Sequence, residues 1–75
     1  MKSIYSHSYR TLLDRIIQSR KDADITQAVL AKKLGRPQSF VSKIESGERR
    51  MDVIEYLHIA KHVGFDPCIF MQELI

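Results

Sequence analysis

The stretch that decides the fold spans residues 26–47 and reads TQAVLAKKLGRPQSFVSKIESG. Its inward-facing apolar positions recur at helical spacing on both sides of a central glycine; they are Leu30, Ala31, Leu34, Val41 and Ile44. Gly35 and Gly47 each follow one of these runs, where a helix commonly ends in a left-handed residue. Thr26 can cap the first run, and the fixed φ of Pro37 suits the first position of the second. The stretch therefore predicts two short helices joined by a tight turn.

Helical periodicity also predicts a helix before this stretch. Ser8 is a candidate cap for a helix over residues 8–21, and residues 22–25 form a short connection. The expected buried positions of this helix are Tyr9, Leu12, Leu13, Ile16 and Ile17. The sequence therefore places one amphipathic helix on the N-terminal side of the helical pair.

Two further helices are predicted after residue 47. Asp52 and Glu55 have the form of a capping box for a helix running to Val63, with Val53, Leu57 and Ala60 expected inside. A last helix is expected over about residues 66–75. No segment alternates as a strand would, so the fold class is all-α: a compact five-helix bundle forming one domain over residues 1–75.

Size and composition exclude several classes of protein. A chain of 75 residues buries a thin core and leaves little room for an enclosed active site, so we expect no enzyme and no cofactor. The single cysteine, Cys68, excludes an internal disulfide and is expected to be a buried thiol. Because no apolar run is long enough to span a bilayer, we expect a cytoplasmic protein without a membrane partner.

Charge is concentrated around the helical pair. The net charge is +3, and the basic residues in or beside residues 26–47 are Lys32, Lys33, Arg36, Lys43, Arg49 and Arg50. With Gln27, Ala31, Gly35, Gln38, Glu45 and Gly47 in register, this stretch resembles the lambda-repressor-like, Cro-type (XRE) helix-turn-helix DNA-binding family. The resemblance extends over about residues 9–75 and implies a sequence-specific transcriptional regulator that docks its third helix in the major groove, most commonly as a repressor.

The exposed face at the start of the third helix supplies the candidate base-contacting residues: Gln38, Ser39, Phe40, Ser42 and Lys43. Glutamine pairs with adenine, lysine reaches guanine, and serine can donate or accept a hydrogen bond. Phe40 has two interpretations. It can contact a thymine methyl group, or it can fold back against the preceding helix and the edge of the core.

Other residues are expected to position the DNA or the recognition helix. Candidate phosphate contacts are Gln27, Arg36, Ser46, Arg49 and Arg50, of which Gln27 and Ser46 are implied by the resemblance. The resemblance also implies that Gln27 buttresses Gln38 and that Arg20 and Glu45 form a structural ion pair. Pro37 and Val29 depart from the family pattern, which has a serine or threonine cap and an acidic residue at these positions.

The last helix is apolar around most of its circumference. We expect a dimer interface formed by Ile69, Phe70, Met71, Leu74 and Ile75, and therefore a homodimer on an inverted-repeat DNA site. Two alternatives remain: an antitoxin-like DNA-binding protein that binds a second protein through this helix, or a protein-interaction domain without DNA affinity. Glu55, His58 and His62 share one side of the fourth helix, but a solvated polar face explains them better than a metal site.

Overall fold

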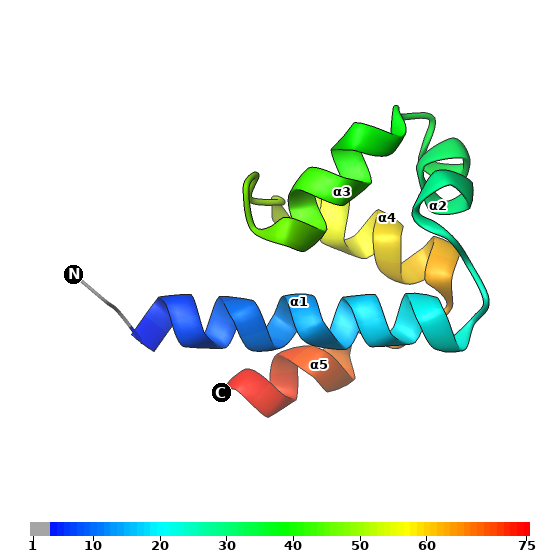
Figure 1. Cartoon of the computed structure of the whole chain (residues 1–75). Helices are drawn as coiled ribbons and strands as arrows, with labels where there is room; N and C mark the ends of the chain where they lie inside the picture. The colour runs from blue at the N-terminus through cyan, green and yellow to red at the C-terminus, as the bar shows by residue number, and fades with distance from the viewer. Residues whose placement is uncertain (1–3) are drawn as a thin grey trace.

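The computed structural model describes residues 4–75 of the chain. Within them it contains the helices α1 (Ile4–Asp22), α2 (Gln27–Leu34), α3 (Gln38–Ser46), α4 (Val53–Val63) and α5 (Pro67–Leu74). The expected all-α, five-helix bundle is confirmed. Helix α1 runs through the middle of the molecule, with α2 and α3 on one side and α5 on the other (Figure 1). Helix α5 packs against α1 and α4 and does not contact α2 or α3.

The core forms where α1, α2, α3 and α4 meet. Its most deeply buried side chains are Leu13, Ile16, Leu30, Val41 and Ile44, each of which was expected inside. Tyr9 and Leu34 are half-buried and pack against this core. The helical spacing of apolar residues thus identified most of the inner faces of the first three helices, although Ile17, which was expected inside, is only half-buried.

Helix α4 turns a different face inward from the one predicted. Val53 and Leu57 are 67% and 43% exposed, so the expectation that they are buried is wrong. The buried residues are Tyr56, Ile59, Ala60 and Val63, which also follow helical spacing. Two apolar stripes therefore compete on this helix. The stripe that faces the core includes Tyr56, whose hydroxyl donates a hydrogen bond to the Pro67 carbonyl at 2.6 Å.

Most helix ends follow the predicted caps. The Thr26 side chain accepts from Val29 N–H, and Asp52 and Glu55 form a full capping box. Pro37 is the N-cap of α3 with an extended backbone, rather than the first helical residue. Ser8 lies inside α1, so its predicted capping role is wrong; no glycine or proline in residues 4–7 prevents the helix from starting earlier.

Helix α5 divides its apolar residues between the core and the surface. Phe70 and Leu74 pack against the core, and the Phe70 ring stacks on Phe65 with centroids 4.5 Å apart. Ile69 and Met71 are exposed. Cys68 is exposed as well, which corrects the expectation of a buried thiol, because the short helix turns Phe70 and Leu74 inward. None of the described helices is long and apolar enough to cross a membrane.

Candidate nucleic-acid interface

Helix α3 is fixed to α1 by a buried ion pair. Arg20 donates from Nε to Glu45 Oε2 at 2.7 Å and from Nη2 to Oε1 at 2.9 Å. The third guanidinium nitrogen, Nη1, donates to the Ile25 carbonyl at 2.8 Å. Both residues are only 7% exposed, so the pair is shielded from water and its hydrogen-bonding groups are satisfied within the protein. This contact sets the position of α3 relative to α1.

Gln27 connects α2 to the same carboxylate. Its side-chain Nε2 donates to Glu45 Oε1 at 2.9 Å, and the residue is half-buried. Within the described residues no hydrogen bond joins it to Gln38, which was its expected partner. The amide of Gln27 therefore supports α3 through Glu45, at the end of the helix opposite to Gln38.

The outer face of α3 carries polar side chains that the core does not use. Gln38, Ser39 and Lys43 are exposed, and Ser42 is half-buried. The Ser42 hydroxyl donates to the Ser39 carbonyl at 3.3 Å and still has lone pairs to accept a hydrogen bond. These four expected residues lie in the first two turns of one helix and can approach a ligand together.

Phe40 does not belong to this outer face. Its side chain is 8% exposed and is part of the hydrophobic core, which supports the second of its two interpretations and argues against a contact with a thymine methyl group. Phe40 precedes Ile44 by one helical turn, and together with Val41 the two form one broad apolar stripe. That spacing was readable in the sequence.

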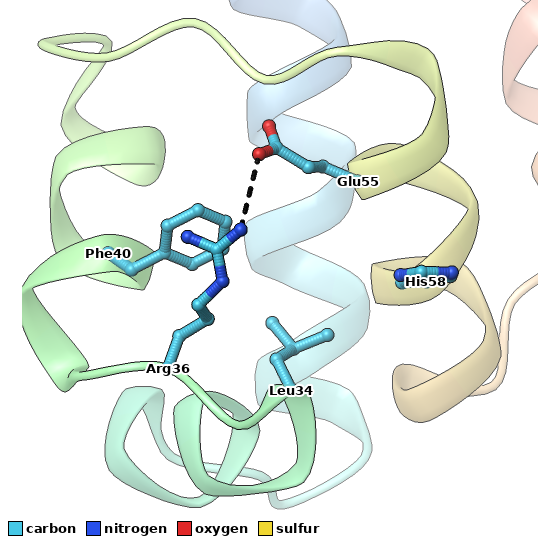
Figure 2. Close-up of a pocket in the computed structure, with 5 residues that line it drawn as sticks. All are labelled: Leu34, Arg36, Phe40, Glu55 and His58. Carbon is cyan, nitrogen blue, oxygen red and sulfur yellow. Dashed lines mark ion pairs between the residues drawn. The ribbon is translucent and has the colours of Figure 1, made fainter.

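Two arginines that are expected to contact phosphate lie over the Phe40 ring. The guanidinium carbons of Arg36 and Arg49 lie 4.3 and 4.8 Å from the ring centroid, within the range of a cation–π interaction. Figure 2 shows Arg36 over this ring, facing Glu55 across a small pocket that Leu34 and His58 also line. The pocket holds only about 40 Å³, far below the several hundred Å³ typical of a small-molecule site.

Glu55 is the residue of this region that the sequence interpretation missed. Arg49 donates from Nη1 and Nη2 to its two carboxylate oxygens at 2.9 and 3.0 Å, and Arg36 Nη2 lies 3.9 Å from Oε2. The hydrogen bonds from Arg49 hold the pKa of the Glu55 carboxyl below its ordinary value, and the same contact raises the pKa of Arg49. Glu55 was assigned only a capping role and a solvated position, but its side chain is 15% exposed.

The remaining expected phosphate contacts lie at the C-terminal end of α3 and beyond it. The Ser46 hydroxyl donates to the Lys43 carbonyl and accepts from Glu48 N–H, at 3.1 and 3.3 Å. Arg50 is exposed, with its guanidinium carbon 4.4 Å from the centroid of the Tyr9 ring. Ser46 ends α3 and Arg50 lies in the α3–α4 connection, so α3 has basic or polar groups at both ends.

Comparison with known proteins agrees with this geometry. A family model described as a helix-turn-helix domain matches residues 12–68. The chain is also similar to a solved structure, an XRE-family like protein from Pseudomonas syringae pv. tomato str. DC3000. The two chains are 48% identical with a TM-score of 0.91, and the match covers 95% of this chain and 87% of the other. No curated protein matches the chain.

A short helix held on two others, with its polar face outward, is the arrangement that helix-turn-helix DNA-binding regulators use. The matches extend beyond α2 and α3 to nearly the whole bundle. The chain belongs to the XRE-type helix-turn-helix family.

Proposed function

We propose that this protein is a sequence-specific transcriptional regulator that reads DNA by placing α3 in the major groove. The observation that carries the proposal is the contrast between the two faces of α3. Its inner face is locked by the buried pair of Arg20 and Glu45, while its outer face presents unburied polar side chains near the N-terminal end. A rigidly held helix with that face outward is what major-groove readout requires.

The proposed base contacts are Gln38, Ser39, Ser42 and Lys43. A glutamine amide can make two hydrogen bonds to adenine, and a lysine ammonium can donate to guanine O6 or N7. The two serine hydroxyls can serve as donors or acceptors, and so they adapt to several bases. Phe40 is left out of this set because its ring is buried.

The proposed phosphate contacts surround this helix. Arg36 precedes α3, while Ser46, Arg49 and Arg50 end it or follow it, and Gln27 begins α2. Their contacts with the DNA phosphates on either side of the major groove would fix the register of α3 without reading the base sequence. They would also make the affinity fall with salt concentration.

A homodimer that represses by occupying its site is the form of action we propose. Of the expected interface residues, Ile69, Met71 and Ile75 are exposed, whereas Phe70 and Leu74 pack against the core. The neighbouring helix α4 adds the exposed apolar side chains Val53, Ile54 and Leu57. Val53 and Met71 line one groove, so the two helices contribute to a continuous surface. Helix α5 does not contact α3, and a second copy bound there leaves α3 open to DNA. Two-fold symmetry would then match an inverted repeat.

Selection of bound duplexes from a random library at physiological salt tests the proposal. An enriched inverted repeat with half-sites about 34 Å apart supports both the DNA-reading and the homodimer. Enrichment of a single half-site supports the reading and contradicts the dimer. A folded protein that enriches no sequence contradicts the proposed function and favours a protein-interaction domain.

A further inference from the structure

Four residues at the edge of the DNA-facing surface form a group that we call the Phe40 cluster: Arg36, Phe40, Arg49 and Glu55. They come from the turn before α3, from α3 itself, from the α3–α4 connection and from α4. The aromatic ring is buried, while the arginine side chains above it are 48% and 40% exposed. The cluster therefore joins the recognition helix to α4 at the surface where DNA would approach.

The carboxylate of Glu55 is fixed from two directions. Its Oε1 accepts the Asp52 backbone N–H at 3.0 Å as part of the capping box, and both oxygens accept from Arg49. The backbone of Arg49 is fixed in turn, because its N–H donates to the Lys43 carbonyl at 3.1 Å. A planar guanidinium held by two parallel hydrogen bonds has one orientation, whereas a lone arginine samples many.

The charges of the cluster argue for a role beyond stability. Two guanidinium groups lie over one ring, and their mutual repulsion is reduced by a single carboxylate beside them. That carboxylate repels DNA phosphates and weakens the pull of both arginines on any duplex, whatever its sequence. An arginine held in a fixed place contributes to binding only where a phosphate of the DNA backbone reaches it. A duplex docked in the correct register meets this condition, and a duplex of unrelated sequence does not.

We propose that Glu55 is a positioning residue, which holds Arg49 against Phe40, offsets the charge of Arg36 at 3.9 Å, and thereby lowers the affinity for DNA of unrelated sequence. This inference rests on the proposed function, since it concerns how the same surface discriminates between duplexes. Glu55 touches no DNA in this scheme. It acts through the arginines.

The test is the salt dependence of binding to a short duplex of scrambled sequence, measured for the wild-type chain and for Glu55→Gln. Glutamine can retain the capping box because its amide oxygen also accepts the Asp52 N–H. It removes the negative charge, and with it the two charged hydrogen bonds that hold Arg49. We expect Glu55→Gln to bind several-fold more tightly at low salt, with a slope of log affinity against log salt that steepens by up to about 0.9.

Glu48→Gln is the matched control for net charge. Glu48 is exposed in the α3–α4 connection, and within the described residues its carboxylate makes no ion pair. Its substitution removes one negative charge without touching the Phe40 cluster, and we expect a smaller gain in affinity. An equal gain for the two variants overturns the proposal, because net charge would then explain both. An unchanged or weaker Glu55→Gln overturns it as well.

Two further readings separate the possible failures. A folded wild-type chain that binds neither scrambled nor library-selected duplexes contradicts the proposed function itself, whereas the outcomes above contradict only the role of Glu55. Should Glu55→Gln fail to fold, the side-chain NMR signals of Arg49 in the wild-type chain decide. Hindered rotation of the guanidinium group supports the proposal that Glu55 holds Arg49, and free rotation overturns it.

Discussion

Two arginine–glutamate pairs in or next to α3 have nearly the same hydrogen-bond distances and very different surroundings. Arg20 and Glu45 meet at 2.7 and 2.9 Å with side chains that are 9% and 6% exposed. Arg49 and Glu55 meet at 2.9 and 3.0 Å, but their side chains are 40% and 15% exposed. Distance alone therefore does not determine what a pair contributes. The buried pair is expected to hold the fold, and the exposed pair to restrain groups that DNA would meet.

Breaking the buried pair should produce the largest effect. Glu45→Gln leaves the Arg20 guanidinium buried without a counter-charge, and we expect a loss of about 3–5 kcal/mol in the free energy of unfolding. Denaturant unfolding of both proteins measures it. A combined Arg20→Met and Glu45→Leu variant is the control, because removing both charges should restore much of the loss. A loss below about 1 kcal/mol for Glu45→Gln would show that water reaches the pair.

Gly47 links the two pairs, because it ends the helix that carries Glu45 and begins the connection that carries Arg49. Its φ of +84° lies in the left-handed region, where a Cβ is strained. We expect Gly47→Ala to cost about 1–2 kcal/mol in thermal or denaturant unfolding. Gly64→Ala is the matched control, with a φ of +99° at the end of α4. The Gly64→Ala variant should lose a similar amount of stability. A much smaller loss for Gly47→Ala would contradict the backbone strain expected of an alanine at residue 47.

The exposed pair should give the smallest change in stability and a distinct dependence on pH. Because the pKa of Glu55 is lowered in the folded state, its contribution is present above the unfolded pKa and is lost as pH falls through the folded pKa. The stability difference between the wild-type chain and Glu55→Gln should therefore be constant near neutral pH. It should shrink below about pH 4.3, where unfolded glutamates protonate. A stability difference that grows toward acidic pH would contradict the pairing of the Glu55 carboxylate with Arg49.

The sequence predicted best those features that depend on neighbours along the chain. Helices α2 and α3, their glycine ends and the capping box at Asp52 follow from local spacing and chemistry. The pairing of Arg20 with Glu45 did not follow from spacing. It came from the resemblance to a family, because the two residues are far apart in the sequence and only packing brings them together.

The misplaced features were decided by competition between faces or by the path of a connection. Helix α4 has more apolar positions than its inner face can use, so Val53 is exposed. In α3 the inner face is broader than expected and takes in Phe40 together with Val41 and Ile44. The contact of Arg49 with Glu55 depends on how residues 47–52 turn between α3 and α4. No periodic pattern in the sequence encodes that turn.

We propose that the outer face of α3 recognises the base sequence of DNA, and removing two side chains from that face tests this proposal most directly. The ratio of affinities for the library-selected duplex and a scrambled duplex is measured for the wild-type chain and for the double variant Gln38→Ala and Lys43→Ala. Both residues are exposed, so folding should persist, and the ratio should fall by the equivalent of about 1–3 kcal/mol for each side chain that no longer reaches a base. If the double variant kept the wild-type ratio while remaining folded, α3 would not be the element that reads the sequence.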